Sequence, residues 1–237
     1  MSHSAIAELD QQMKITERKT CRVCYSNRLI PIFSLGKQYV SNFINKEDEG
    51  KGVKAPLELV LCENCSLLQL KHTAPQELLY ARFYWYHSGF TQIMRNALRE
   101  IAETTAKIVN LKKGDIVLDI GANDGTLLGF YQTDIIKVGC EPAKNLIEEL
   151  KNHCEYFIND FWNYNAYKKL GIKKAKIVTA IGMFYDMEDP NQFFADAAKA
   201  MSEDGIFVTQ LMCLKNMLEK NDVSNLCHEH LEYYSLE

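Results

Sequence analysis

Two pairs of cysteines have the spacing of a metal site. Cys21 and Cys24 form one C-x-x-C pair, and Cys62 and Cys65 form a second. Each pair places two thiols on one side of a tight turn, and four thiolates make the tetrahedral set that Zn²⁺ prefers. Because the protein would fill every position, we expect a structural zinc. Buried free cysteines or a thioredoxin-like redox pair are the alternatives, but neither pair has the βαβ context of a redox pair.

A second stretch with chemical meaning reads V-L-D-I-G-A-N-D-G-T-L-L, residues 117–128. Residues 115–120 resemble a buried parallel strand, and Gly121 and Gly125 permit a tight turn into a helix that begins near Thr126. The G-x-G-x-x-G spacing of dinucleotide sites is missing, and Asp124 would repel a pyrophosphate. A positively charged cofactor without phosphates fits better, which indicates S-adenosylmethionine. An ordinary turn with a solvated Asp124 is the alternative.

Acids also end the next two predicted strands. Glu141 follows residues 135–140 and lies about twenty residues past Asp119, where a carboxylate can accept both ribose hydroxyls. Asp160 and Phe161 follow the short strand 156–158, where an acid can accept an adenine amino hydrogen while a ring packs on the base. Each acid alone has a plain surface residue as its alternative, but three at successive strand ends favour a cofactor site.

The segment C-H-E-H-L-E-Y-Y-S, residues 227–235, is dense in groups that move protons. His228 and His230 lack the H-E-x-x-H spacing that puts two imidazoles on one helix face, which argues against a metal site. The pattern favours a histidine base whose orientation or pKa is set by Glu229. A polar helix start with packed tyrosines is the alternative.

These residues need a scaffold, and the pattern predicts an α/β Rossmann-like sheet behind a small four-cysteine domain. Ligands of such sheets collect at the carboxyl ends of the strands, so we expect one cleft there. The aromatic run in residues 76–86 is either core packing or a pocket wall. We predict domains at 1–75 and 76–237, a lead-in helix within 5–13, strands at 30–35, 56–61, 115–120, 135–140, 156–158, 176–181 and 206–211, a turn at 202–205, and helices at 88–111 and 191–201.

Composition limits the class of protein. The chain has 237 residues, 47% of them hydrophobic, and a net charge of −4. It has no basic field to hold nucleic acid and no apolar span or signal sequence, so we expect a cytoplasmic globular protein with no nucleic-acid or membrane partner. Eight cysteines in that compartment point to metal binding before disulfides.

Taken together, the motifs resemble the S-adenosylmethionine-dependent sugar C-methyltransferases. The matching segments are C-R-V-C, L-G-K-Q-Y-V-S-N-F, P-L-E-L-V-L-C-E-N-C-S-L-L-Q-L, Y-W-Y-H-S-G, L-D-I-G-A-N-D-G-T-L-L, G-C-E-P-A and C-H-E-H-L-E-Y-Y-S, in that order. The family joins an N-terminal zinc-binding domain to a class I methyltransferase domain. It acts on nucleotide-linked keto-deoxy sugars in deoxysugar biosynthesis, by deprotonation next to the ketone and methyl transfer to the enolate.

The resemblance implies roles for particular residues. Four zinc thiolates are implied at the two cysteine pairs, with His230 as the base, Glu229 beside it and Tyr86 in the cleft. Where relatives often hold Asn and His after the fourth strand, this chain has Gly182 and Asp186, so Asp186 receives no role. The cofactor contacts expected from the turn, the strand ends and the resemblance are Tyr84, Ser88, Asp119, Gly121, Asn123, Asp124, Glu141, Asp160, Phe161 and Gly182.

One departure concerns the end of the chain. Too few residues follow Leu211 for the last two strands of a class I sheet or for the family's C-terminal domain, so we expect a partial methyltransferase domain. Two other functions stay open: a zinc-containing RNA methyltransferase, which would need a basic face, and a non-catalytic truncated remnant, which would not bind S-adenosylmethionine.

Overall fold

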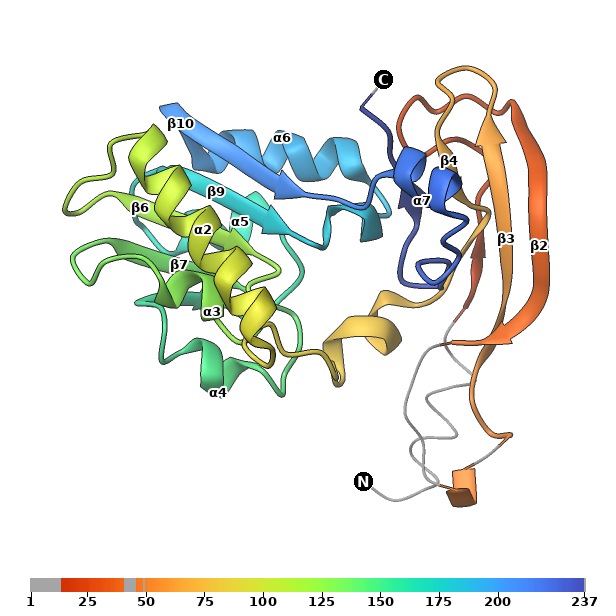
Figure 1. The fold of residues 1–237 in the computed structure, drawn as a ribbon, viewed down its shortest axis with the longest axis horizontal. Helices are drawn as coiled ribbons and strands as arrows, with labels where there is room; N and C mark the ends of the chain where they lie inside the picture. Colours follow the sequence, from red (N-terminus) through yellow and green to blue (C-terminus); the bar gives the residue numbers. More distant parts are fainter. Residues whose placement is uncertain (1–13, 41–45, 49, 237) are drawn as a thin grey trace. The chain divides into compact units, whose positions relative to one another are not determined.

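The computed structural model describes residues 14–40, 46–48 and 50–236. The predicted helix within residues 5–13 lies outside them. The chain divides into two compact units (Figure 1). The cysteine unit holds the described residues up to Leu79, the segment Tyr185–Asp189 and the described residues from Met212 onward. The parallel-sheet unit holds Tyr80–Phe184 and Pro190–Leu211.

The parallel-sheet unit is built on five parallel strands in the order β10-β9-β6-β7-β8. The first of them along the chain, β6, lies in the middle, and the chain then fills first one side and afterwards the other. This is the predicted doubly wound arrangement, whose ligand crevice opens where the strand order reverses, here between β6 and β9. The strands are β6 Ile116–Ile120, β7 Ile136–Cys140, β8 Tyr156–Ile158, β9 Ala175–Ile181 and β10 Met201–Gln210.

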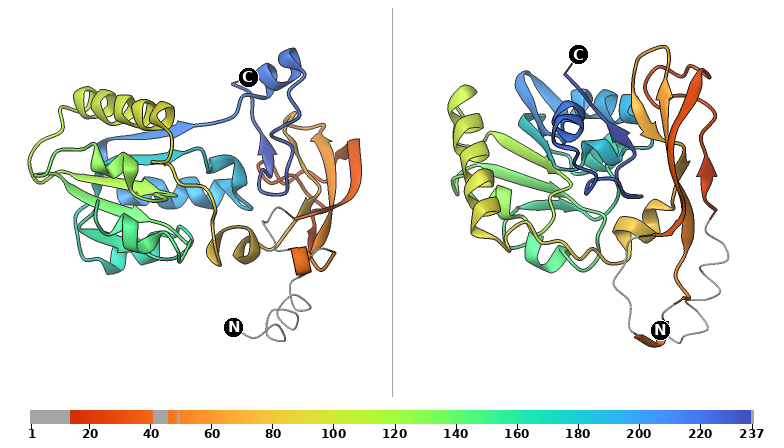
Figure 2. Two further views of the ribbon diagram at one scale, coloured as in Figure 1. Left: turned by 60° about the horizontal axis from the view of Figure 1, so that its bottom comes forward. Right: turned by 45° about the vertical axis from the view of Figure 1, so that its right-hand side comes forward.

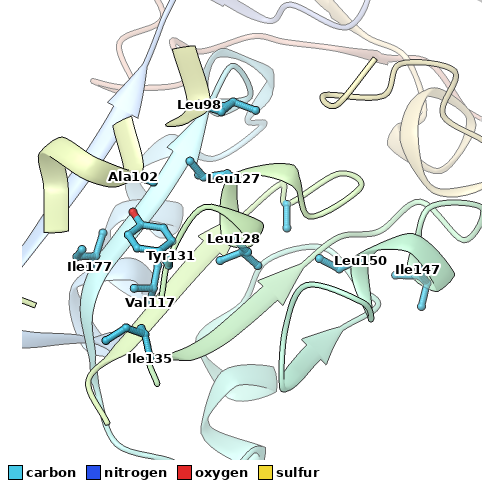
Figure 3. Packing of buried hydrophobic residues seen from close by; sticks show 11 residues of the cluster. Leu98, Ala102, Val117, Leu127, Leu128, Tyr131, Ile135, Ile147, Leu150 and Ile177 are labelled. Carbon is cyan, nitrogen blue, oxygen red and sulfur yellow. The ribbon is translucent and has the colours of Figure 1, made fainter. Parts of the chain in front are cut away.

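Helices cover both faces of this sheet, and Figures 1 and 2 show α2 and α6 on opposite sides of it. In α2, Leu98, Ala102 and Thr105 form the buried stripe. The close view in Figure 3 shows Leu98 and Ala102 packed over the sheet beside Leu127 of α3. The helices are α2 Gln92–Ile108, α3 Thr126–Gly129, α4 Ile147–Leu150, α5 Tyr164–Lys169 and α6 Pro190–Ala200.

Two predicted boundaries in this unit were wrong. The helix expected from residue 88 begins at Gln92, because Thr91 is extended and its side chain caps the nitrogen of Met94. The turn expected at 202–205 is a register irregularity inside β10, between Met201 and Ile206. A Cβ at Gly205 would lie 3.0 Å from the Lys176 carbonyl oxygen, so this close approach of two backbones requires glycine.

The cysteine unit contains an antiparallel sheet in the order β11-β4-β3-β2 and a small β1-β5 pair. Its strands are β1 Thr16–Glu17, β2 Leu29–Tyr39, β3 Lys54–Cys62, β4 Leu68–Leu70, β5 His72–Thr73 and β11 Glu232–Tyr233. The helical segments of the unit or at its borders are η1 Lys46–Asp48, η2 Glu77–Ala81, η3 Phe184–Asp186 and α7 Leu214–Lys220.

The last strand of the described chain, β11, belongs to the sheet of the cysteine unit. Glu232 and Tyr233 pair with Gln69 and Leu68 of β4. A buried cluster of Leu57, Leu70, Leu231 and Tyr233 joins the two ends of the chain. The compact units therefore do not follow a single cut near residue 75, since residues 185–189 and 212–236 group with the cysteine unit.

Candidate functional site

The two C-x-x-C turns have the same local shape. The residue after each second cysteine is left-handed, with φ of 60° at Tyr25 and 61° at Ser66. The nitrogens of these residues donate to the carbonyl oxygens of Cys21 and Cys62, at 3.1 and 2.8 Å. Two equivalent turns therefore present their thiols in the same way.

The four thiols converge as the spacing predicted. The Sγ atoms of Cys21 and Cys65 are 3.6 Å apart, those of Cys24 and Cys62 are 3.5 Å apart, and all four lie within 4.8 Å of one another. A tetrahedral zinc with Zn–S bonds of about 2.3 Å separates its sulfurs by about 3.8 Å. The arrangement fits Zn²⁺ held entirely by protein thiolates.

In the parallel-sheet unit, the turn after β6 needs its glycines. Gly121 and Gly125 have φ of 73° and 81°. A Cβ would lie 2.8 Å from Met183 Cγ at Gly121 and 2.9 Å from His153 Cβ at Gly125. Both the left-handed backbone and the close neighbours exclude a side chain, which confirms the predicted turn.

Glu141 joins this turn to the end of β7. Its Oε2 accepts from the nitrogen of Asn123 at 2.9 Å and its Oε1 from the nitrogen of Ala143 at 2.8 Å. Burial raises the pKa of Glu141, against the effect of these two backbone donors. Each carboxylate oxygen still has acceptor capacity, which suits the role of accepting hydroxyl groups.

Asn123 and Asp124 fasten the segment 86–89 to the turn. Asn123 Oδ1 accepts from the nitrogen of Ser88 at 2.8 Å, and its Nδ2 donates to the carbonyl of Tyr86 at 3.0 Å. Asp124 accepts from the nitrogens of Gly89 at 2.7 Å and Thr126 at 3.0 Å. Asp124 is thus neither solvated nor poised only for a ligand, and direct contact of either side chain with a cofactor stays a prediction.

The aromatic run before this segment is not a core cluster. Phe83, Trp85 and Tyr86 are 48%, 52% and 47% exposed. Burial, and then the charge of Asp124, raise the pKa of Tyr86, so its hydroxyl stays protonated. Tyr84 is clamped by Asn145, which accepts from the Tyr84 nitrogen and donates to its carbonyl, both at 2.9 Å. No sequence signal singled out Asn145.

The ends of β8 and β9 border the same edge of the sheet. Asp160 is exposed, and its Oδ1 accepts from the nitrogen of Phe161 at 2.8 Å. Asn159 connects this end to β7, because its Nδ2 donates to the carbonyl of Glu141 at 2.9 Å. At the end of β9, Gly182 has φ of 66° and donates to the carbonyl of Gln210 at 3.0 Å. The predicted acids of β7 and β8 are thus brought together.

Asp119 differs from the other acids because it lies beneath the turn. It is 3% exposed, and Thr179 of β9 donates to its Oδ1 at 2.6 Å. Burial raises the pKa of Asp119 to about 7, and Thr179 only partly opposes this effect. Its contact with a cofactor stays a prediction.

Replacing Asp119 by Asn is expected to stabilise the folded chain at pH 8 but not at pH 4. Because the folded pKa of about 7 lies above the ordinary 3.8, the wild-type stability is complete below pH 3.8 and falls as the pH rises through 7. The linked free energy of unfolding is up to about 4 kcal/mol. Urea unfolding at both pH values measures it, with the exposed Asp134→Asn as control; an equal effect at both pH values would contradict it.

In the cysteine unit, His230 is held in one tautomer. Its Nδ1 lies 2.7 Å from the carbonyl oxygen of Asn225, which can only accept, so Nδ1 carries the proton and Nε2 has a free lone pair. Burial lowers the pKa of His230, and the Asn225 carbonyl and the charge of Glu229 partly oppose this. The ring of Tyr185 lies 4.7 Å from the imidazole, centroid to centroid. The carbonyl of Asn225 orients the imidazole, and Glu229 contributes charge.

His228 has a different environment. It is 2% exposed, and its Nε2 lies 3.1 Å from the carbonyl oxygen of Ala55 on β3. It therefore pins the segment to the sheet. Among the described residues, neither His228 nor His230 belongs to a group of three or more possible metal ligands. This agrees with the prediction that the H-E-H segment is not a metal site.

Comparison with known families matches both parts of the chain. Residues 21–80 match a family described as a putative zinc binding domain, and residues 90–237 match one described as a methyltransferase domain. The chain belongs to the methyltransferase family. The strand order, the cysteine cluster and these matches confirm the expected class I methyltransferase fold behind a four-cysteine domain.

The methyltransferase is similar to the C-methyltransferase NovU of Streptomyces niveus, with 25% identity over 221 residues. The match covers 91% of this chain and 52% of NovU, so the chain spans about half the length of that relative. This relative supports the sugar C-methyltransferase family that the motifs indicated.

Solved structures with a similar fold include three methyltransferases. An S-adenosylmethionine-dependent methyltransferase from Clostridium acetobutylicum has 13% identity and a TM-score of 0.43, over 53% of this chain and 54% of that one. The plantazolicin methyltransferase BpumL, solved with SAH, has 14% identity and a TM-score of 0.45, over 53% and 50%. DesVI of Streptomyces venezuelae has 15% identity and a TM-score of 0.40, over 50% and 51%. Within the described residues, no helix has the length and apolar content to cross a bilayer.

Proposed function

We propose that this methyltransferase transfers a methyl group from S-adenosylmethionine to a carbon atom beside the ketone of a nucleotide-linked keto-deoxy sugar. The observation that carries the proposal is the state of His230. A carbonyl oxygen fixes its proton on Nδ1, and burial lowers its pKa, so a neutral imidazole with a free Nε2 is present near neutral pH. Abstraction of a weakly acidic C–H proton requires such a base.

The residues of the parallel-sheet unit fit the cofactor. Glu141 and the exposed Asp160 offer carboxylate acceptors at neighbouring strand ends, and Phe161 follows as a ring that can pack on a base. Asn123 and the glycine turn complete the set of residues that would hold the cofactor. When bound, S-adenosylmethionine supplies an electrophilic methyl group on a cationic sulfur, which suits a site rich in acids.

The proposed reaction balances within this set of groups. His230 Nε2 takes the proton from the carbon beside the ketone, and the electron pair of the broken C–H bond moves into the enolate. The enolate carbon then forms a bond to the methyl group as the methyl–sulfur bond breaks, which leaves a neutral thioether. The negative charge of Glu229 favours the imidazolium that His230 becomes, and Tyr86 remains a protonated hydroxyl that can donate a hydrogen bond.

Zinc would have a structural part in this enzyme. Four cysteine thiolates complete a tetrahedral shell and leave no position for water or substrate, so the ion supplies cross-links rather than Lewis-acid chemistry. Cys21, Cys24, Cys62 and Cys65 would hold it.

A direct assay tests the proposal. We expect zinc-loaded protein, given S-adenosylmethionine labelled with ¹³C in its methyl group and a panel of nucleotide-linked keto-deoxy sugars, to give a new ¹³C-methyl signal bonded to a sugar ring carbon. The same assay is run with transfer and ribosomal RNA. Label on RNA alone would move the function to RNA methylation. Calorimetric titration that detects no binding of S-adenosylmethionine would show a non-catalytic module.

A further inference from the structure

Arg22 lies inside the first C-x-x-C turn, and its side chain is completely buried. Burying a guanidinium costs several kcal/mol unless each donor finds an acceptor. Here Nη1 donates to Leu70 O at 2.6 Å and to Gln69 Oε1 at 3.2 Å, Nη2 to Thr73 Oγ1 at 2.8 Å, and Nε to Glu188 Oε2 at 3.3 Å. One side chain of the first cysteine turn thus connects β4, β5 and the segment 185–189.

The first of these connections leads to His230 through β4. Leu70, whose carbonyl binds Arg22, donates its own N–H to the carbonyl of Leu231 at 2.9 Å. Gln69 pairs with Glu232 in the β4–β11 ladder. The residue directly after His230 is therefore fixed to the strand that Arg22 holds.

The second connection leads to His230 through the segment 185–189. Glu188 accepts from Arg22 at 3.3 Å and from Thr73 at 2.6 Å, which anchors this segment. Tyr185, three residues earlier, accepts the N–H of Leu231 at 2.9 Å through its carbonyl, and its ring meets the imidazole of His230 at 81°. Both the strand beside His230 and the ring against it thus depend on acceptors of Arg22.

The same side chain is tied to the cysteine centre. Gln69 donates from Nε2 to Cys21 Sγ at 3.2 Å, and its Oε1 accepts from the backbone nitrogen of Arg22 at 3.1 Å. A metal ion that fixes Cys21 and Cys24 also fixes the backbone of the residue between them. Glu232, fully buried with Oε1 3.9 Å from Arg22 Nε, adds a second acid beside the guanidinium.

We propose that Arg22 is a positioning residue for His230. By holding β4 and the segment 185–189 in one arrangement, it keeps the carbonyl of Asn225 and the ring of Tyr185 in place around the imidazole, so that Nδ1 stays protonated and Nε2 stays free. The inference rests on the proposed role of His230 as the base. It makes the first cysteine turn part of the apparatus that prepares the base, beyond its part in metal binding.

Arg22→Lys is the test, because it keeps the positive charge but replaces the planar fork by one ammonium that cannot reach the acceptors of both connections. We expect the ¹⁵N signals of His230, in zinc-loaded protein with labelled histidine, to change from the Nδ1-protonated tautomer to a tautomer mixture. We expect kcat to fall about tenfold with little change in KM for the sugar, since geometry rather than binding is lost. The zinc content should be unchanged.

Arg18→Lys is the matched control. Arg18 also binds Glu188, at 2.8 Å between Nη1 and Oε1, and it is not a contact of β4 among the hydrogen bonds described for Arg22, so the His230 signals should stay as in the wild type. If Arg22→Lys does not fold, Thr73→Val decides, because it deletes the hydroxyl between Arg22 and Glu188 and should shift the His230 signals in the same direction by less.

Wild-type His230 signals in folded Arg22→Lys, or in Thr73→Val where that variant decides, would overturn the inference. The ¹⁵N measurement needs no turnover. If the wild type methylates no sugar, the proposed function fails, while the tautomer comparison still decides whether Arg22 positions the imidazole.

Discussion

His230→Gln is expected to abolish deprotonation of the sugar. Without S-adenosylmethionine, the wild-type protein should exchange the proton beside the ketone for deuterium from D₂O, since the first step needs only the base. A positioned general base contributes about 10²- to 10⁴-fold, so the variant should lose at least about 100-fold of the exchange rate above the protein-free reaction. Proton NMR of the sugar measures the exchange.

Two control variants separate the base from its surroundings. Asp160→Asn should lower the affinity for S-adenosylmethionine but keep the deuterium exchange, because Asp160 is proposed to act only on the cofactor. His153→Gln changes an exposed histidine of the parallel-sheet unit and should leave both unchanged. Exchange at the wild-type rate in His230→Gln would assign the base to another residue.

Removing zinc is expected to unfold the cysteine unit. Apparent binding free energies of structural zinc reach about 10 to 16 kcal/mol in small domains, which is comparable to the whole stability of a domain. After treatment with a strong chelator, amide hydrogens of β3, β4 and β11 should lose their protection, while those of β6 and β7 keep it, because the parallel sheet has its own buried core. Hydrogen exchange followed by mass spectrometry measures this.

Cys65→Ser should reproduce the effect of the chelator in part, since it leaves three thiolates. Its matched control is Cys154→Ser, which changes a half-buried thiol of the parallel-sheet unit that bonds only to the Leu150 carbonyl among the described contacts. Equal protection of β3 with and without chelator would show that the thiols do not depend on a metal for their arrangement.

Local sequence patterns predicted the parallel sheet well. The strands around Val117, Val138 and Val178 are short apolar runs that end in glycine or an acid, and such runs are recognisable one at a time. The cysteine spacing also predicted the convergence of the thiols, because a C-x-x-C turn fixes its own geometry. In both cases the information lies within a few consecutive residues.

Features that depend on distant partners were not predictable. Arg22 was read only as a letter between two cysteines, although its acceptors come from residues 69–73 and 188. Asp124 was read as a ligand contact or a solvated acid, but its partners include Gly89, which no local pattern connects to the turn. The carbonyl of Asn225 that orients His230 carries no side-chain signature at all.

The pairing of β11 with β4 has a consequence for how the protein is made. The ribosome delivers all four cysteines early, yet Leu231 and Tyr233, half of the buried cluster that closes their sheet, emerge only after the entire parallel sheet has been synthesised. Since domains fold as their residues become available, the part of the molecule that is translated first is completed last. A nascent chain halted before residue 230 would carry its metal ligands on a sheet that still lacks its outer strand.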